Sequence, residues 1–409
     1  MKGPSSHKRL PASCLLAVLV ILVCSEAFAA GSPQQDAPAW SVNLHTFGSP
    51  GDSPREWPPR SWNWKGPLEP PDFWFWQRGI SFTDDDTLAV YFVIQQEPTK
   101  LSVRGSPQPS DPFQLRGIFF DVSSGRVKHE QQWSTAADTP SGIFATHDGR
   151  FLVLGGQQLS LYSRDFGLLR QLSLHTGEGR PPWWEVEVSP TGQFLFLVRS
   201  TIRPRQKHVL RLKSDTLEQL NTLDAWDEKG FFHIAAGENT LARQERHVVL
   251  VRSVDGPWRA IHTMGASASQ DTSQEYDSVF LDNQTILLTN RTQGFVLLST
   301  EGKVLFEENL QEELGKRGAL MELGKSQDGS RFAIGVAWFR GGRFDTAEYR
   351  AVWRVIVYDV GRQKRIVAVD VKPQRDVIHT LALSPNGQWL AVLVGSKVQV
   401  FRLPPLAER

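Results

Sequence analysis

The sequence predicts an all-β protein, a single seven-bladed β-propeller with four-stranded blades. One strand–turn–strand pattern recurs seven times in the 409 residues, and a strand pattern without a partner precedes the first copy. Repeats of roughly 40–50 residues with four short strands each are typical of propeller blades. The repeats fill residues 40–405, so we expect one repeat domain.

The clearest copy of the repeat is LALSPNGQWLAVLVGSKVQVFRL, residues 381–403, which has its first turn at Asn386-Gly387. Aligning the first turns makes these residues equivalent: Asp85, Gly149, Gly192, Glu238, Asn283, Gly329 and Gly387. Their intervals are 64, 43, 46, 45, 46 and 58 residues. Gly and Asn accept a left-handed turn at low cost. The apolar runs that follow the turns suit strands covered on both faces.

The turn residues Ser384-Pro385-Asn386-Gly387, followed by Leu390-Ala391, resemble the repeats of WD-repeat and YVTN-type seven-bladed propellers. Ser189-Pro190-Thr191-Gly192 matches the same form closely. The resemblance covers nearly all of residues 40–405 and implies the fold. It says little about function, because such scaffolds host binders and enzymes alike.

The ends of the repeat array predict how the ring closes. The last copy stops at Arg402-Leu403 after three strands, and a separate strand pattern begins at Trp40. A ring must hide the edges of its sheets, and an N-terminal strand that completes the last blade does so. We therefore expect residues 40–46 to pair with residues 397–402.

Residues 306–318 have the one helix-like pattern in the chain. Leu310 and Leu314 are four residues apart, and acidic residues precede Lys316-Arg317, which matches the helix dipole. We expect a short surface helix that crosses between blades.

Residues 1–29 predict a signal peptide. A basic start is followed by an apolar run, Leu15 to Val23, and by Ala27-Phe28-Ala29, an A-x-A cleavage pattern. We expect cleavage after Ala29 and a secreted or periplasmic protein. The alternative is an uncleaved anchor, but the run is shorter than the roughly 20 residues of a spanning helix, so no stable membrane span is expected after cleavage. Residues 30–39 then form a short linker, and residues 406–409 form a tail.

Composition argues against several classes of partner and cofactor. Lys and Arg number 45 against 44 for Asp and Glu, and this balance gives no field to attract nucleic acid. The two cysteines lie in the signal segment, and the ten histidines form no metal-binding spacing, so we expect no metal and no cofactor. Asp84-Asp85-Asp86 suggests calcium, but its place on a tight turn favours a solvated acidic corner. We expect a monomer.

The longest connections are predicted to project from one face of the ring. With the strands of each blade named a to d from the inside out, the a–b turns are short in every copy. The long segments are b–c turns or crossovers between blades: residues 47–76, 95–112, 134–141, 175–183, 201–206, 264–276, 308–318 and 338–351. Binding residues concentrate on loops carried by a rigid scaffold, so this face is the candidate site.

Aromatic and arginine residues mark the candidate binding positions on that face: Trp62, Trp64, Trp74, Trp76, Trp183, Trp184, Arg340 and Arg343. Five tryptophans lie among prolines in residues 57–76, which could form a stiff lid that stacks on a carbohydrate or anchors a protein. The alternative is a plug packed against the ring. Residues 339–350 could bind a carboxylate or phosphate through arginine, or form a solvated hairpin extension.

Polar residues on the inner strands are candidates for a site in the central channel: Glu187, His233, Asp277, Glu322 and His379. They suit an enzyme that resembles the YVTN-like lactonases or the quinoprotein dehydrogenase propellers, or they surround a watery channel. No linear catalytic motif accompanies them. The sequence favours a non-catalytic scaffold that binds a protein or carbohydrate on its loop-rich face, with the propeller enzyme as the alternative.

Overall fold

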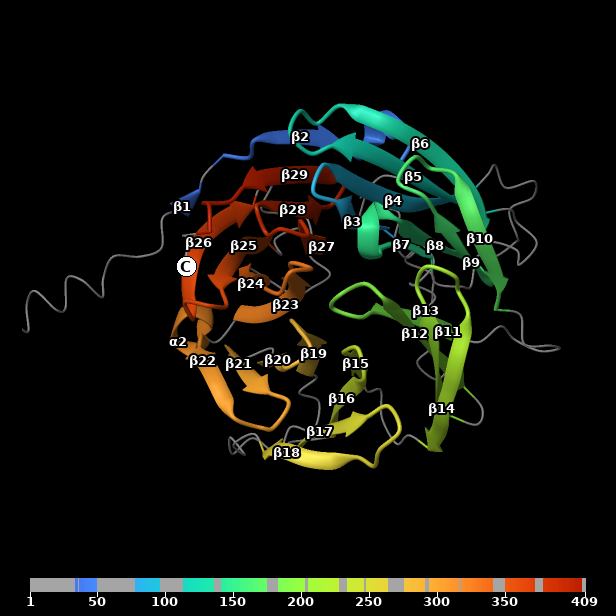
Figure 1. The fold of residues 1–409 in the computed structure, drawn as a ribbon. Helices are drawn as coiled ribbons and strands as arrows, with labels where there is room; N and C mark the ends of the chain where they lie inside the picture. Colours follow the sequence, from blue (N-terminus) through green and yellow to red (C-terminus); the bar gives the residue numbers. More distant parts are fainter. Residues whose placement is uncertain are drawn as a thin grey trace, which may run out of the picture.

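In the computed structural model, seven antiparallel blades of four strands each form a β-propeller, and a short parallel strand is added to one of them (Figure 1). The structure describes residues 34–35, 37–49, 78–95, 113–135, 141–174, 183–202, 205–227, 234–245, 248–263, 276–290, 294–315, 318–340, 350–371 and 378–406. Within these ranges no helix is long and apolar enough to cross a membrane. The predicted fold class is confirmed.

The first three blades follow one another along the chain, each running from the inner strand a to the outer strand d. Blade 1 contains β3 (Arg78–Asp84), β4 (Thr87–Gln95), β5 (Phe113–Asp121) and β6 (Val127–Thr135). Blade 2 contains β7 (Gly142–Ala145), β8 (Phe151–Gly155), β9 (Gln158–Tyr162) and β10 (Leu168–Ser173). Blade 3 contains β11 (Trp183–Val188), β12 (Phe194–Ile202), β13 (Arg205–Lys213) and β14 (Gln219–Asp227).

The remaining blades continue the same order. Blade 4 contains β15 (Ile234–Ala236), β16 (Thr240–Glu245), β17 (Val248–Ser253) and β18 (Arg259–Thr263). Blade 5 contains β19 (Tyr276–Phe280), β20 (Thr285–Asn290), β21 (Gly294–Ser299) and β22 (Val304–Asn309). Blade 6 contains β23 (Gly318–Lys325), β24 (Arg331–Arg340), β25 (Arg350–Asp359) and β26 (Lys364–Val371). Blade 7 contains β27 (Ile378–Leu383), β28 (Trp389–Val394) and β29 (Lys397–Arg402), and its fourth strand comes from the N-terminal part of the chain.

The ring closes as the sequence predicts. The fourth strand of blade 7 is β2 (Trp40–Asn43), which pairs antiparallel with β29 in the register Trp40↔Val400 to Asn43↔Lys397. The strand is shorter than the expected residues 40–46, because the Asn43 side chain accepts a hydrogen bond from the His45 N–H and starts the short 3-10 helix η1 (Leu44–Phe47). The Trp40 indole N–H donates to the Val122 carbonyl at 2.6 Å, which fixes the closing strand to blade 1.

The linker segment adds a short fifth strand to blade 6. Gln34 and Gln35 form β1 (Gln34–Gln35), which lies parallel to the outer strand β26 with Gln34 opposite Ala368. Two residues of the expected linker thus cover part of an outer sheet edge.

The recurring serine and glycine of the first turn have distinct structural roles. In blade 7 the Ser384 hydroxyl accepts a hydrogen bond from the Trp389 N–H at 3.0 Å, and Gly387 has φ 67°. In blade 3 Ser189 receives the Phe194 N–H at 3.0 Å, and Gly192 has φ 73°. The serine satisfies the first donor of strand b, and glycine supplies the left-handed conformation that the turn requires.

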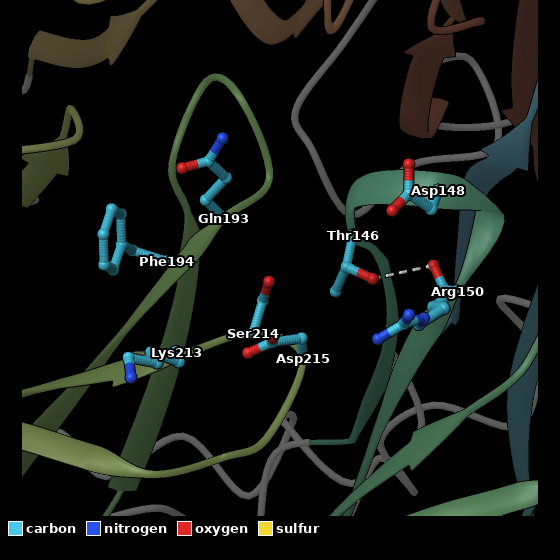
Figure 2. Close-up of a pocket in the computed structure, with 8 residues that line it drawn as sticks. All are labelled: Thr146, Asp148, Arg150, Gln193, Phe194, Lys213, Ser214 and Asp215. Carbon is cyan, nitrogen blue, oxygen red and sulfur yellow. Dashed lines mark hydrogen bonds between the residues drawn. The ribbon is translucent and has the colours of Figure 1, made fainter.

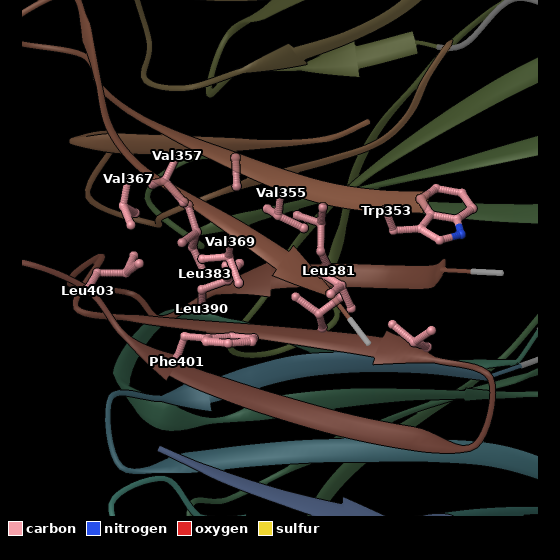
Figure 3. Packing of buried hydrophobic residues seen from close by; sticks show 14 of the residues in the cluster. Trp353, Val355, Val357, Val367, Val369, Leu381, Leu383, Leu390, Phe401 and Leu403 are labelled. Carbon is pink, nitrogen blue, oxygen red and sulfur yellow. The ribbon is translucent and has the colours of Figure 1, made fainter. Parts of the chain in front are cut away.

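The apolar core lies between neighbouring blades. Each of the seven contacts between adjacent blades holds its own cluster of buried apolar side chains. Between blades 6 and 7, Trp353 and Val355 lie in the same cluster as Leu381, Leu390 and Phe401 (Figure 3). Strands packed on both faces need apolar side chains in continuous runs, which explains the apolar stretch after each first turn.

The expected helix within residues 306–318 is a single turn. It is α2 (Gln311–Leu314), and residues 306–309 belong instead to β22, where Glu308 lies opposite Phe295 of β21. Leu310 and Leu314 are buried against blades 5 and 6, so pairing with β21 overrides the helical pattern before Leu310. The helix does cross between blades, as expected.

Candidate functional site

All of the long connections leave the ring at one end of the blades. In the described strands every a–b turn and every c–d turn has at most five residues. The b–c turns and crossovers include residues 44–77, 96–112, 136–141, 174–182, 228–233, 264–275, 341–349 and 372–377. In an antiparallel blade these connections join strand ends on the same side. The predicted loop-rich face is therefore the side of the ring where strands b and d end.

The base of the Trp- and Pro-rich insertion is fixed at both ends to one residue of blade 7. The Leu44 N–H donates to the Ser396 carbonyl at 2.7 Å before the insertion. After it, Arg78 donates from Nη1 to the Ser396 hydroxyl at 3.3 Å. Leu44 is fully buried, and Phe47 packs edge-on against Phe120 with ring centroids 5.8 Å apart. The insertion therefore starts and ends beside the contact between blades 7 and 1.

The predicted binding residues of this face are placed only in part. Trp62, Trp64, Trp74, Trp76 and Arg343 lie outside the described residues. Trp183 and Arg340 lie at strand ends on the loop-rich face, where they pair with Ser200 and Arg350.

Trp184 is placed in the core. Its side chain is 2% exposed and packs in the cluster between blades 2 and 3. Among the described residues its indole nitrogen has no hydrogen-bond partner. A side chain this buried offers no face for a ligand to stack on, so its position suits packing between blades.

On the opposite face, the first turns of neighbouring blades are hydrogen-bonded to one another. Glu238 of blade 4 accepts from the Thr191 N–H of blade 3 at 2.9 Å and also from the Thr191 hydroxyl. The Glu238 N–H donates to Asn283 of blade 5 at 3.1 Å, and Asp85 of blade 1 accepts from the Asn386 N–H of blade 7 at 2.9 Å. At the aligned positions that lack glycine, the side chains of Asp85, Glu238 and Asn283 thus accept hydrogen bonds that join neighbouring blades.

Two residues of the acidic corner at Asp84–Asp86 form ion pairs with an arginine of the next blade. Arg164 of blade 2 lies 3.2 Å from Asp84 and 3.5 Å from Asp86. The pKa of Asp85 is raised, chiefly by burial, and its neighbours Asp86 and Asp84 raise it further. Within the described ranges no three His, Cys, Asp or Glu side chains are grouped to hold a metal ion.

A polar pocket of about 350 Å³ lies between blades 2 and 3 on the first-turn face. Its lining residues are Thr146, Asp148, Arg150, Gln193, Phe194, Lys213, Ser214 and Asp215 (Figure 2). The set holds two cations, Arg150 and Lys213, and two anions, Asp148 and Asp215, and Asp148 has a left-handed φ of 63°. Mixed charge around an open pocket favours no single class of ligand.

A second cavity of about 200 Å³ lies where the inner strands end on the first-turn face, and we call it the channel mouth. Residues of blades 1, 2, 3, 6 and 7 line it, and most are apolar. Its one charged lining residue is Lys325, at the end of β23. Lys325 donates from Nζ to the Phe280 carbonyl at 2.5 Å, and burial lowers the pKa of its ammonium group to about 8.

The predicted channel residues are spread along the inner strands. Glu187, Asp277, Glu322 and His379 lie on β11, β19, β23 and β27, and His233 lies outside the described residues. The negative charge of Glu187 on blade 3 raises the pKa of Lys325 on blade 6, so these two side chains interact electrostatically.

The sequence interpretation missed Lys325. The signal was available, because Lys325 directly precedes the serine of its first turn, where the matching copies have Val188 and Leu383. A charged residue at a position that is apolar in the clearest copies of a repeat indicates a specific local role.

The similarity of this chain to known proteins is limited to its fold. No protein-family model matches the chain, and no curated protein matches its sequence. A chain of the mitotic checkpoint complex matches in structure with a TM-score of 0.50 at 11% identity, over 99% of this chain and 97% of that chain. The fold of this chain is a seven-bladed β-propeller.

Two further solved structures are similar to this propeller. Raptor from Chaetomium thermophilum matches at 10% identity and a TM-score of 0.50, over 81% of this chain and 28% of that one. The C-terminal WD40 domain of Sif2 matches at 12% identity and a TM-score of 0.43, over 80% and 95%. At these identities the likeness concerns the fold alone.

Proposed function

We propose that this propeller is an exported, non-catalytic scaffold that binds a protein partner on its loop-rich face. The observation that carries the proposal is the anchoring of the Trp-rich insertion. The residues that flank it, Leu44 and Arg78, are both hydrogen-bonded to Ser396, which supports placing the base of the insertion on the loop-rich face.

The spread of the connections favours a protein over a carbohydrate as the partner. Long connections leave several blades around the ring, and such a face offers contact area well beyond that of a sugar ring. A typical protein interface buries about 800 Å² on each partner, and its strongest contacts are enriched in Trp and Arg. The sequence of this face supplies both residue types at Trp62, Trp74 and Arg343.

The rigid frame supports the same proposal. Apolar clusters fill the contacts between all adjacent blades, and β2 closes the ring. A closed, well-packed frame limits the groups that must be ordered on binding, which favours recognition by the loops that it carries. Export is supported by the pattern of residues 1–29.

Site-specific photo-crosslinking in the source cell tests the proposal. A benzophenone amino acid is placed at Trp74 or Phe344 for the loop-rich face, and at Gln193 or Gln388 for the first-turn face as matched controls. We expect a discrete adduct that protease removes, formed from the loop-face positions and absent from the controls. An adduct removed by glycoside hydrolases instead identifies a carbohydrate ligand and overturns the protein partner.

Equal adducts from both faces, or no adduct from the loop face, would contradict the proposal. A second measurement uses the variant Trp62→Ala/Trp64→Ala/Trp74→Ala. We expect it to lose the adduct formed from Phe344 while its melting temperature stays unchanged. A large drop in melting temperature would identify the tryptophans as a structural plug.

A further inference from the structure

The b–c hairpin of blade 6 projects from the loop-rich face. Its strands β24 and β25 have ten residues each and are the longest strands in the described part of the chain. The matching strands of blades 5 and 7 have six residues each. Because the first turns all lie on the opposite face, the additional residues carry this hairpin about 13 Å beyond its neighbours, at roughly 3.3 Å per residue.

The far end of this hairpin pairs two arginines. Arg340 lies directly opposite Arg350, and they form the last pair in the strand register. The hairpins of blades 1 and 3, whose strands have nine residues, end on pairs with at most one charge. Like charges directly opposite each other destabilise a sheet, and a carboxylate that accepts from both guanidinium groups removes this repulsion.

The base of the hairpin is joined to α2 by described contacts. The Trp338 indole N–H donates to the Glu313 carbonyl at 2.9 Å, and the Arg354 guanidinium lies 5.6 Å from the Trp338 ring centroid. The Glu313 carboxylate pairs with Arg365 at 2.8 Å and with Arg354 at 3.8 Å. Asp370 accepts from Arg354 Nε at 2.7 Å. These contacts fix both strands of the hairpin within four residues of its arginine pair.

The charges of the hairpin favour an anionic partner. Glu313 and Asp370, at its base, are already paired with arginines there. Residues 340–350 hold three arginines against two acids, Asp345 and Glu348. The far end of the hairpin therefore keeps a positive balance, and the planar fork of arginine matches the geometry of a carboxylate.

We propose that the far end of the blade 6 hairpin contacts an acidic segment of the partner protein, and that Arg340 and Arg350 donate to a carboxylate of that segment. This inference rests on the proposed function and names the chemistry of one contact on the loop-rich face. Glu313 is a positioning residue, because it holds the hairpin through Trp338 and Arg354. A hairpin held at its base has less freedom to lose when the contact forms.

The crosslinked adduct formed from position Trp74, outside the hairpin, tests the arginine pair. Arg340→Gln/Arg350→Gln should lower the adduct yield at least about ten-fold, because hydrogen bonds to charged groups are strong. The control Lys303→Gln/Lys364→Gln removes two exposed charges from the first-turn face and should leave the yield unchanged.

The outcomes separate this inference from the proposed function. An unchanged yield in Arg340→Gln/Arg350→Gln would overturn the acidic contact and leave the protein partner in place. No adduct from Trp74 in the unaltered protein would contradict the proposed function itself. A yield that is lost when the cell extract is treated with phosphatase before crosslinking would identify a phosphate in place of the carboxylate, and would also overturn the inference.

The opposite change of charge gives a second test on the same hairpin. Asp345→Asn/Glu348→Gln removes two acids that repel an acidic segment, so the adduct yield should rise. A yield that falls or stays the same would contradict the proposal, even if the arginine variant is too unstable to use.

The positioning role of Glu313 is tested on α2. Glu313→Gln weakens the pairs with Arg365 and Arg354, so the adduct yield should fall and hydrogen exchange in β24 and β25 should become faster. The matched control Glu312→Gln changes an exposed residue of the same helix and should alter neither. Equal results for the two variants would overturn the positioning role.

Discussion

Burial at the channel mouth sets the protonation of Lys325, and this single residue couples the stability of the propeller to pH. Lys325 donates a hydrogen bond to the Phe280 carbonyl, and the pocket that it lines is mostly apolar. Holding it charged there costs free energy that the unfolded chain does not bear.

The pH dependence follows from the lowered pKa. Between pH 8 and 10.5 the unfolded chain binds more protons at this lysine than the folded chain, so this residue makes stability rise with pH. Compared with Lys325→Met, the unaltered protein should gain up to about 1.4 kcal/mol per pH unit in this window. Urea unfolding of both proteins at pH 7, 8, 9 and 10 measures the difference, and parallel curves would contradict the prediction.

Arg331 is a second buried cation, and its hydrogen bonds join blade 6 to blade 7. It is 1% exposed, and it donates to the Gly387 carbonyl at 2.6 Å and to the Pro404 carbonyl at 2.5 Å. Burial lowers its pKa, while Asp359 opposes the shift. The guanidinium therefore fastens blade 6 to the turn of blade 7 and to the end of the chain.

At the scale of elements, hydrogen bonds between first turns join neighbouring blades, and those of Glu238 join blades 3 and 4. Among the described residues, the buried cluster between blades 3 and 4 includes Phe196, Val198 and Leu241. Arg211 donates across the same contact to the Glu238 carbonyl at 2.9 Å. Hydrogen bonds of Glu238 and Arg211 thus add to the apolar contact between blades 3 and 4.

Replacing Glu238 should weaken this contact. Glu238→Ala leaves the Thr191 N–H and hydroxyl without their acceptor, and hydrogen bonds to charged groups contribute about 1.5–3 kcal/mol each. We expect the free energy of unfolding to fall by about 2–4 kcal/mol in urea titrations. The control Glu218→Ala removes an exposed partner of Lys213 and should change stability much less. Equal effects of the two variants would count against the role of the turn bonds.

At the scale of the whole molecule, ring closure links the N-terminal part of the chain to its C-terminal blade. The Trp40 and Val42 side chains pack into the cluster between blades 7 and 1, which also includes buried Leu44. Without β2, the edge of β29 would be open to another chain.

Deleting residues 34–43 should therefore destabilise the ring. We expect a lower melting temperature and concentration-dependent association, measured by calorimetry and by light scattering. The matched deletion of residues 34–38 removes β1 and keeps β2, so it should melt close to the intact protein. A full deletion that melts like this control would show that closure by β2 is dispensable.

The candidate site was less predictable from sequence than the fold. Repeat spacing placed the inner strands, and with them Glu187 and Glu322, but periodicity carries no information about the contacts across the channel. The sequence interpretation placed Trp184 on a ligand-binding surface, whereas packing between blades 2 and 3 buries that side chain. The single helical pattern was likewise shortened by strand pairing at Glu308.

The sequence by itself determined the seven blades, the short first turns and the closing strand, because each depends on local turn chemistry and on apolar runs that recur along the chain. Tertiary structure decided which turn residues join neighbouring blades, which tryptophan is buried, and that Lys325 lines an apolar cavity near three carboxylates. These outcomes depend on groups far apart in sequence that meet only when the ring closes, and their burial then sets their charge.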